Sequence, residues 1–374
     1  MNKKIILIFI MVFLIFGAWL FQDQRETSQE NHPKICALLP LTGGAAQYGK
    51  DALNGLLLAQ EDLKSRGKSQ SELMVLDTKS TVKGAISAFH KAQAAKVDSC
   101  LVMLSGLAKA VAPIAQSAGV FLMATVAAAP KIFPEKAPAF RWYYSGRIVS
   151  EKIGSLISKR NYKAAAIIAE NIDYSSDAAK TLKSFLHSKG INSSIVTYST
   201  KSLDARSIVV KALDMSHNPD VVVLLGSGGK GAGRILKAIA ETGFTGAIVS
   251  DDSVSFPDVL DVAGRAANGV IFVASAFNGK DERNDFVRRY KERYGKEPTD
   301  ISAFSHDIAL LLNSLAGLPD AQSKFKALAQ ALNSFHSVFG DVTADIKARE
   351  ISVPMIYKRI VLEGKNHHFE SIEG

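Results

Sequence analysis

The sequence has few of the residues from which disulfide scaffolds and metal centres are built. Its 374 residues include 2 cysteines and 8 histidines, which is too few cysteines for a disulfide-rich scaffold or a four-cysteine zinc site. The histidines form no H-E-x-x-H pair, and His367-His368 lies on a polar tail. No G-x-S-x-G elbow occurs, and Ser80-x-x-Lys83 stands without the other motifs of a β-lactamase. We therefore expect no metal, no cofactor and no enzymatic activity.

The overall composition is that of an ordinary globular protein. The chain is 47% hydrophobic, 22% charged and 8% aromatic, which argues against disorder, collagen and coiled coil. Its net charge is +9, but basic residues such as Arg288-Arg289 and Lys358-Arg359 are spread along the chain without interleaved aromatic residues. We therefore expect no nucleic-acid partner. The length exceeds what one hydrophobic core usually supports, so we expect two lobes.

The first residues predict export from the cytoplasm. Lys3 and Lys4 precede an unbroken apolar run from Ile5 to Phe21, and a basic stub before a long apolar stretch is typical of an export signal. The run is close to the lower limit for a membrane-spanning helix, and no clean cleavage site follows it. An uncleaved membrane anchor and a cleaved signal peptide both remain open. Residues 1–33 are thus interpreted as signal or anchor and tether, with the rest outside the cytoplasm.

From Lys34 onward, short apolar runs alternate with amphipathic stretches. The expected strands are Lys34–Pro40, Leu73–Asp77, Ser99–Leu104, Val120–Ala124, Ala164–Ala169, Ser194–Tyr198, Val221–Leu225, Ala247–Ser250 and Val270–Ala274. The expected helices between them include Tyr48–Leu63, Gly84–Ala95, Lys152–Lys159, Ala178–His187, Ala205–Met215 and Ile235–Glu241. Apolar strands flanked by helices indicate α/β sheets that are parallel and covered on both faces. Ligands bind at the carboxyl ends of such strands.

Five segments, in order, resemble a known family. They are ICALLPLTGGAAQYGKDALNGLLLAQEDL (Ile35–Leu63), SGLAKAVAPIAQSAGVFLMAT (Ser105–Thr125), ENIDYSSDAAKTLKSFL (Glu170–Leu186), PDVVVLLGSGGKGAGRILKAIAETGF (Pro219–Phe244) and NDFVRRYKERYGKEPTDISAFSHDIALLL (Asn284–Leu312). The set resembles the branched-chain amino acid (leucine/isoleucine/valine) binding proteins. These are substrate-binding proteins of ABC transporters with the type I periplasmic-binding-protein fold.

The resemblance implies two doubly wound parallel-sheet lobes joined by a hinge of three crossovers. We expect the crossovers near Arg141–Gly146, Phe277–Gly279 and Ser337–Gly340. Lobe I would then comprise residues 34–141 plus 279–337, and lobe II residues 142–278 plus 338–374. Hinges need a few residues that absorb backbone rotation, and a glycine lies in each expected crossover. The implied function is capture of a small molecule, an amino acid or a related organic ligand, for delivery to an ABC permease.

The first lobe offers three candidate ligand-binding loops. Gln47 and Tyr48 follow the glycine-rich turn after the first strand, and Tyr48 offers an aromatic wall with a polar tip. Ser105 and Gly106 open a helix, whose N-terminus favours a carboxylate; relatives hold the ligand carboxylate there. Thr125 ends the fourth strand. For the first two loops, helix capping is the alternative explanation.

The second lobe offers three more candidates. Asp252 follows the strand Ala247–Ser250 and matches an acidic residue that pairs with the ligand ammonium in relatives. Tyr174 matches a tyrosine that covers the ligand, and Ser227 lies in a small-residue loop. That loop formally fits G-x-G-x-x-G, but its acidic partner is not well placed for dinucleotide binding. Capping and core packing remain the alternatives for Asp252 and Tyr174.

The chain departs from the family's pattern in the loop after the fourth strand. Amino-acid-binding relatives carry a small hydroxyl residue in its second half, where this chain has Ala128. The departure favours a less polar ligand or one with a single charged end. A membrane-tethered sensor with the same fold is the alternative function, favoured by the possible anchor.

Two further side-chain states are expected inside the lobes. Cys36 and Cys100 begin neighbouring strands, and we favour buried thiols over a disulfide because adjacent parallel strands rarely give suitable geometry. His306 stands where the family usually has a tyrosine, and we expect it to be buried and hydrogen-bonded.

Overall fold

The computed structural model describes residues 33–68, 70–200, 204–364 and 366–373. The predicted export segment, residues 5–21, and most of the tether lie outside the described residues. None of the helices in the described ranges is long and apolar enough to span a membrane.

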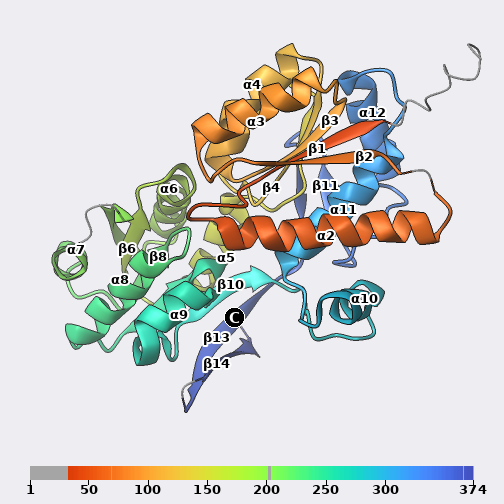
Figure 1. Ribbon diagram of the computed structural model, residues 1–374. Coiled ribbons are helices and arrows are strands. Elements are labelled where there is room, and N and C mark those ends of the chain that lie inside the picture. The colour runs from red at the N-terminus through yellow and green to blue at the C-terminus, as the bar shows by residue number, and fades with distance from the viewer. Residues whose placement is uncertain (1–32, 69, 201–203, 365, 374) are drawn as a thin grey trace, which may run out of the picture.

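Two sheets of seven strands, each in its own lobe, form the framework (Figure 1). The first sheet has the order β11-β12-β5-β4-β3-β1-β2 and the second β14-β13-β10-β9-β8-β6-β7. The strands of the first sheet are β1 (Lys34–Leu39), β2 (Glu72–Asp77), β3 (Ser99–Met103), β4 (Phe121–Thr125), β5 (Ala139–Arg141), β11 (Thr343–Asp345) and β12 (Glu350–Ser352). Those of the second are β6 (Ala164–Glu170), β7 (Asn192–Tyr198), β8 (Val221–Leu225), β9 (Ala247–Ser250), β10 (Ile271–Ser275), β13 (Met355–Glu363) and β14 (Asn366–Ile372).

Helices cover both faces of each sheet, as apolar strands require. Lobe I carries α2 (Ala46–Ser65), α3 (Val82–Ala94), α4 (Ser105–Ser117), α10 (Asp285–Tyr294), α11 (Asp300–Ser314) and α12 (Ala321–Ala331). Lobe II carries α5 (Gly146–Lys159), α6 (Asp173–Ser188), α7 (Ala205–Met215), α8 (Lys230–Glu241), the 3₁₀ turns η2 (Asp252–Ser255) and η3 (Gly264–Ala267), and α9 (Pro257–Ala263). The predicted α/β class and the two doubly wound lobes are confirmed.

Local sequence explains where several helices begin. Thr81, Asp204 and Thr299 each precede a helix, and their side-chain oxygens accept a hydrogen bond from a backbone N–H of the first turn. Such caps satisfy donors that have no partner within the helix. The core strands β3, β4, β8 and β10 are buried along their whole length, which accounts for their apolar sequences.

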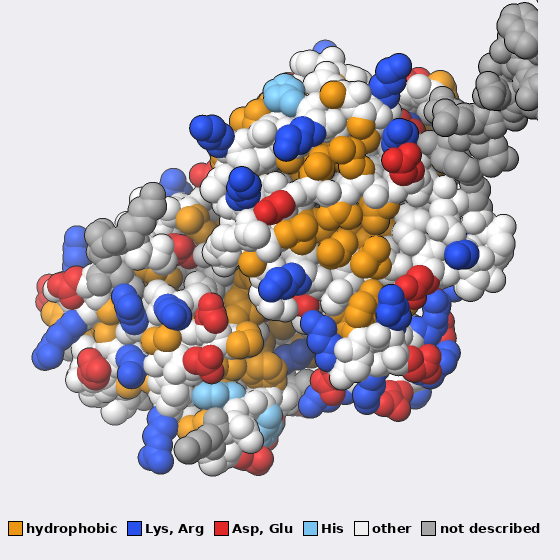
Figure 2. Space-filling model, in the orientation of Figure 1, with side chains coloured by type: hydrophobic (Ala, Val, Ile, Leu, Met, Phe, Trp, Pro, Cys, Tyr) orange, Lys and Arg blue, Asp and Glu red, His pale blue; other side chains and the backbone are white. Residues whose placement is uncertain are grey.

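The edge strand β2 of the first sheet is only partly covered. All its residues except Glu72 are half-buried, and the neighbouring Leu57 of α2 is 39% exposed. Figure 2 shows apolar side chains gathered over this edge and along α2.

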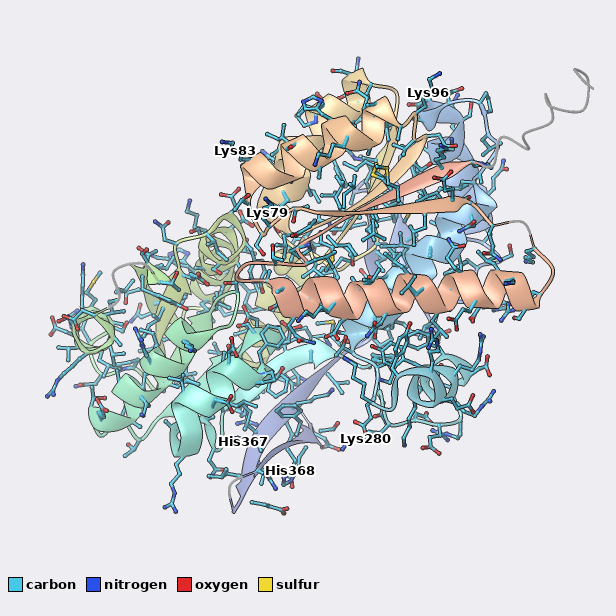
Figure 3. The ribbon with its side chains drawn as sticks, in the orientation of Figure 1. Lys79, Lys83, Lys96, Lys280, His367 and His368 are labelled. Carbon is cyan, nitrogen blue, oxygen red and sulfur yellow. A yellow bond between two sulfur atoms is a disulfide. The ribbon has the colours of Figure 1, made fainter. Side chains whose placement is uncertain are left out.

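The chain crosses between the lobes three times. The first crossing runs from β5 to α5 and the second from β10 to α10, close to the expected positions. The third differs from the expected Ser337–Gly340, because β11 and β12 pair within the first sheet. The chain therefore passes to the second sheet between Ser352 and Met355, and residues 343–352 belong to lobe I rather than lobe II. The last strand, β14, contains His367 and His368, which we expected on a polar tail (Figure 3).

The expectation of two free thiols is wrong. Cys36 and Cys100 form a disulfide inside lobe I (Figure 3). They are in-register partners on β1 and β3 with Cα atoms 4.5 Å apart, which lies within the range that a disulfide can bridge. Both are fully buried.

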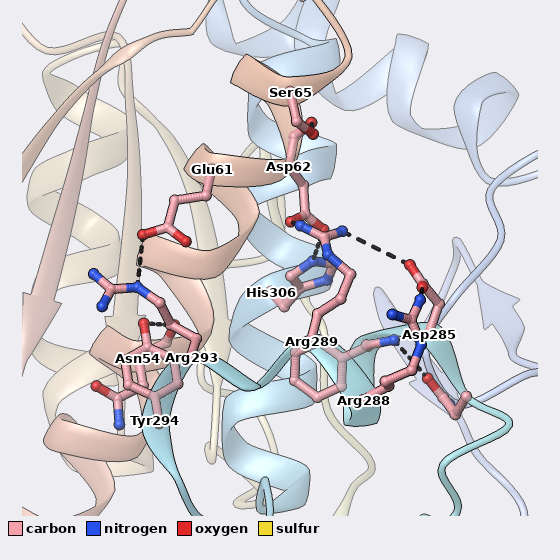
Figure 4. A network of polar contacts seen from close by, with 12 residues as sticks. Asn54, Glu61, Asp62, Ser65, Asp285, Arg288, Arg289, Arg293, Tyr294 and His306 are labelled. Carbon is pink, nitrogen blue, oxygen red and sulfur yellow. Dashed lines mark hydrogen bonds and ion pairs between the residues drawn. The ribbon is translucent and has the colours of Figure 1, made fainter. Parts of the chain in front are cut away.

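The expectation for His306 is confirmed. Its side chain is buried on α11, and Nε2 lies 3.0 Å from Oδ2 of Asp62 on α2. Arg289 of α10 pairs with the same carboxylate (Figure 4). This polar network joins three helices of lobe I.

Candidate functional site

The carboxyl ends of the parallel strands in the two lobes face each other, and the loops that follow them touch. The Tyr48 hydroxyl, on α2 after β1, donates to the Ser227 carbonyl after β8 at 3.0 Å. The Tyr48 ring also meets Phe256 edge-on, with centroids 5.1 Å apart. At the exposed rim of the lobe junction, Lys109 of α4 pairs with Asp173 of α6 at 3.3 Å. Ligands bind at this edge of open α/β sheets, so the candidate site lies between the lobes.

Asp251, after β9, is a carboxylate whose bonding capacity is already used. Its Oδ2 accepts from the Tyr174 hydroxyl at 3.0 Å and from the Gly226 amide at 3.2 Å. Its Oδ1 accepts from the amide and hydroxyl of Ser253. Burial raises the pKa of Asp251 to about 6, while these hydrogen bonds oppose the rise. Asp251 therefore positions the loops of lobe II.

The neighbouring Asp252 has fewer hydrogen-bond partners than Asp251. It is half-buried, and its Oδ2 accepts from the Tyr144 hydroxyl at 3.0 Å. Burial, then the charges of Asp300 and Asp251, raises its pKa to about 8. A cation at this carboxylate would favour its ionised form. Asp252 is thus suited to a ligand ammonium group.

Tyrosines from the first crossover support Asp252. Tyr143 and Tyr144 stack with ring centroids 4.2 Å apart, and the Tyr143 hydroxyl donates to that of Tyr144 at 3.0 Å. Burial raises the pKa of both phenols far above the usual range, so both remain hydrogen-bond donors. Sequence reasoning placed a lobe boundary at these residues but gave them no role in the site. The sequence feature that could have pointed to these tyrosines is the aromatic cluster Phe140–Tyr144.

The small-residue loop after β8 already holds carboxylates of the protein. The amide and hydroxyl of Ser227 donate to Oε2 of Glu170 at 2.9 and 2.7 Å. Gly228 adopts a φ of +85° there, and a Cβ on it would lie 2.4 Å from the Phe256 ring. Because amides of this loop point at Glu170 and Asp251, they are not aimed at a nucleotide phosphate. Ser227 instead offers its carbonyl to Tyr48.

Lobe I contributes a helix terminus and an apolar loop. Gly106 is exposed at the first turn of α4, where helical N–H groups lack partners. The Ser105 hydroxyl beside it accepts from the Ala129 amide at 3.1 Å and still has its own proton to donate. Ala127 and Ala128 are buried. The lobe I side of the junction can therefore bind a carboxylate at the α4 N-terminus and offers few other polar groups to a ligand.

Two expected ligand-binding residues lie differently from the rest. Thr125 is fully buried and its hydroxyl donates to the Trp142 carbonyl at 3.2 Å, so it supports the first crossover. Gln47 is exposed and its amide donates to Asp51 within α2. The other six lie in the loops or first helical turns that follow the strands, and two of them, Tyr48 and Ser227, touch across the lobe junction. The six, whose part in binding a solute stays a prediction, are Tyr48, Ser105, Gly106, Tyr174, Ser227 and Asp252.

The described residues contain no group of three or more histidine, cysteine, aspartate or glutamate side chains placed to hold a metal ion.

With this geometry established, the comparisons with known proteins identify the family. A family model described as "Periplasmic binding protein" matches residues 33–361. The chain belongs to the periplasmic binding protein family. The predicted resemblance is thereby confirmed, and as a family member the chain is a solute-binding protein.

Individual relatives are distant. The chain is 24% identical over 290 residues to "Leu/Ile/Val-binding protein homolog 7" of Brucella suis, an alignment that covers 71% of each protein. Its fold is similar to the leucine-binding protein LivK of Thermotoga maritima, with a TM-score of 0.78, 22% identity and coverage of 90% of this chain and 97% of that one. It is also similar to a solute-binding protein of R. palustris in complex with benzoate, with a TM-score of 0.76, 20% identity and coverage of 91% and 96%.

Proposed function

We propose that this periplasmic binding protein captures a small organic solute between its lobes and delivers it to an ABC permease. The proposal rests chiefly on the direct contact of Tyr48 with Ser227 and Phe256 across the lobe junction. In a hinged protein such contacts exist only when the lobes are closed, and a ligand that touches both lobes favours that state. The names of the relatives, which bind leucine and benzoate, agree with a solute of this size.

We infer that the solute carries a cationic nitrogen at Asp252 and a polar or anionic end at the α4 N-terminus. Asp252 is a half-buried carboxylate at the junction, and Gly106 marks the exposed first turn of α4. The rings of Tyr48 and Phe256 and the buried Ala127–Ala129 loop suit an apolar body between those ends. Leucine, phenylalanine and their deaminated or decarboxylated analogues are therefore the first solutes to test.

Export is part of the proposal, supported by family membership and by the Cys36–Cys100 disulfide. Structural disulfides persist in oxidising compartments outside the cytoplasm. Whether residues 5–21 anchor the protein or are cleaved is open to an N-terminal sequencing experiment on the exported protein. A tethered sensor gains no support from the comparisons, and we prefer transport.

A thermal-shift screen tests the proposal. Each solute is offered in three forms: with both charged ends, without its amine, and without its carboxylate. A solute at 100 times its dissociation constant raises the free energy of unfolding by about 2.7 kcal/mol. Each kcal/mol raises the melting temperature by roughly 2–4 °C. We expect the forms that retain the amine to stabilise most. Equal shifts with amine-free acids would contradict the role of Asp252, and no shift with any small solute would contradict capture itself.

A further inference from the structure

A buried ion pair lies at the base of the hinge, away from the ligand-facing side chains. Nη2 of Arg141, the last residue of β5, lies 2.8 Å from Oε2 of Glu350 on β12. The two residues are in-register neighbours on adjacent parallel strands, and they are 5% and 7% exposed. They are 209 positions apart in the sequence, and β12 precedes the third crossing.

The arginine holds the loop that follows β4. Nη1 of Arg141 donates to the carbonyl of Ala127 at 2.8 Å and to that of Ala129 at 2.7 Å. The carbonyl between them, on Ala128, accepts from the amide of Gly146 at 2.7 Å. Three successive carbonyls of this loop are therefore held by the hinge region: two by Arg141 and one by the first residue of α5.

The glutamate holds the start of lobe II. Its Oε1 accepts from the Ser145 hydroxyl at 3.2 Å and lies 3.9 Å from Nη2 of Arg147. Ser145 precedes α5, but its side chain makes no capping bond to that helix. Its hydroxyl is instead committed to Glu350. One carboxylate thus joins lobe I, through Arg141, to the first residues of lobe II.

The same loop reaches the ligand-facing side of lobe I. The Ala129 amide donates to the Ser105 hydroxyl at the α4 N-terminus. Gly146 also packs against Tyr174, because a Cβ at Gly146 would lie 3.0 Å from that ring. An unbroken set of contacts therefore runs from Ser145 through Glu350, Arg141 and Ala129 to Ser105.

We propose that the Arg141–Glu350 pair is a positioning element that couples the hinge to the ligand-facing loop, residues 126–129. Rotation of lobe II moves Ser145 and Gly146, which loosens Glu350 and frees the Ala128 carbonyl. The loop and the Ser105 hydroxyl then lose their fixed geometry, so the ligand side of lobe I is organised only when the lobes close. The inference rests on the hinged closure that the proposed function assumes. A coupling of this kind requires an element with two states that both sites influence.

The sharpest test is a pair of matched serine variants of the full chain, each measured with a saturating solute from the screen so that the lobes are closed. Ser145→Ala removes the hydroxyl that donates to Glu350 and keeps the backbone bond from the Gly146 amide to the Ala128 carbonyl. Ser150→Ala removes a comparable buried bond on the same helix, from the Ser150 hydroxyl to the Ala178 carbonyl at 2.9 Å, away from Glu350. Hydrogen exchange measured by mass spectrometry then follows the Ala129 amide, which lies on the far side of the ion pair from Ser145.

We expect Ser145→Ala to raise exchange at Ala129 and Gly146 by about tenfold, on the order expected for losing a bond to a charged group. Ser150→Ala should leave exchange at Ala129 unchanged. Glu350→Gln should raise it further, and Glu350→Asp should recover part of the protection. Equal exchange in the two serine variants, whether both raised or both at the wild-type level, would overturn the coupling.

Cross-linking separates this inference from the proposed function. Lys109→Cys and Asp173→Cys place thiols at the rim contact between the lobes, where a bis-maleimide can hold the lobes together. In the cross-linked protein, Ser145→Ala should no longer raise exchange at Ala129, because lobe II cannot rotate. Raised exchange that persists would show that the serine acts only locally and would overturn the coupling. Solute binding in the screen is independent of both results, so capture and coupling fail separately.

Discussion

The two lobes share the arrangement of their first five strands and differ in the residues that they place at their common junction. The first sheet runs β2-β1-β3-β4-β5 and the second β7-β6-β8-β9-β10, and each is completed by two strands from the C-terminal part of the chain. Where Cys36 pairs with Cys100 on β1 and β3, the second sheet pairs Ala166 with Val222 on β6 and β8. The same scaffold is thus cross-linked in one lobe and held by packing alone in the other.

The loops that follow the strands differ more sharply than the strands. In lobe II, acids and small polar residues stand at the carboxyl ends of the strands: Glu170 is the last residue of β6, Ser227 follows β8 and the Asp251-Asp252 pair follows β9. Lobe I ends β3 at a helix terminus and β4 in the buried Ala127–Ala129 loop. Neither lobe alone offers both kinds of contact to a solute. Closure of the lobes would therefore bring both kinds of contact to one solute.

The largest effect is expected from removing the disulfide that distinguishes lobe I. The disulfide closes a loop with a sequence separation of 64, so replacing both cysteines by alanine should lower the free energy of unfolding by about 4 kcal/mol. Denaturant unfolding of the oxidised and reduced wild type and of the double variant measures this loss. We expect the reduced wild type and the double variant to unfold at similar denaturant concentrations. A double variant as stable as the oxidised wild type would show that packing alone holds both lobes.

The second largest effect is expected from removing the Asp252 carboxylate of lobe II. Asp252→Asn should weaken binding of an amine-bearing solute by about 10- to 100-fold, because the ammonium loses a charge-assisted hydrogen bond. Isothermal titration calorimetry measures the loss. Asp204→Asn is the matched control, with the same change of charge in the same lobe, at the cap of α7. Equal affinity in Asp252→Asn and the wild type would remove Asp252 from the site.

The free energy of unfolding should also depend on pH through the ionisation of Asp252. Its pKa is raised from 3.8 to about 8 in the folded protein, so between these values the folded state binds a proton that the unfolded state lacks. The free energy of unfolding should therefore fall as pH rises through this window. Asp252→Asn should flatten the fall, as melting temperatures at pH 5 and pH 8 would reveal. An amine should bind more tightly at the higher pH, where the carboxylate is ionised.

A smaller effect concerns the bond between the lobes. Tyr48→Phe removes the hydroxyl that reaches the Ser227 carbonyl and should weaken solute binding by about fivefold, or roughly 1 kcal/mol. Tyr294→Phe is the control, because the Tyr294 hydroxyl donates to the Asn54 carbonyl within lobe I. Binding measured on both variants should fall only for Tyr48→Phe. If both variants bind equally well, the cross-lobe bond contributes nothing to closure.

The smallest effect is expected at the rim. Lys109 and Asp173 are more than half exposed, and such surface pairs contribute between roughly 0.2 and 1 kcal/mol. Lys109→Ala should therefore change solute affinity less than Tyr48→Phe does, and less still in high salt. Calorimetry at two salt concentrations checks this. An effect as large as that of Asp252→Asn would mean that the rim, rather than the buried junction, controls closure.

The repeated α/β pattern could be predicted from the sequence because its signals are local. The apolar runs of β8 and β9 have the predicted bounds, and α7 begins and ends as expected. The short strand β5 was missed, since three residues carry no periodicity. Strands β11 and β12 were assigned to the wrong lobe, because only their partners in space determine the sheet to which they belong.

The site was less predictable, because its details depend on distant partners. The resemblance named Tyr48, Ser105 and Asp252, but nothing in the sequence shows that the Thr125 hydroxyl is taken by the Trp142 carbonyl. The disulfide depended on strand register, which brings the two Cα atoms to 4.5 Å. The Arg141–Glu350 pair joins β5 and β12, which are far apart in the sequence and become neighbours only in the folded sheet. Each of these facts is set by tertiary geometry rather than by local pattern.

The central claim, that two lobes close on a solute, is tested most directly by small-angle X-ray scattering. Measurements are made on the protein without ligand, with a saturating solute from the screen, and after cross-linking at positions 109 and 173. We expect the solute to lower the radius of gyration of the free protein to the value of the cross-linked one. A solute that binds while the radius of gyration stays unchanged and above the cross-linked value would contradict the account.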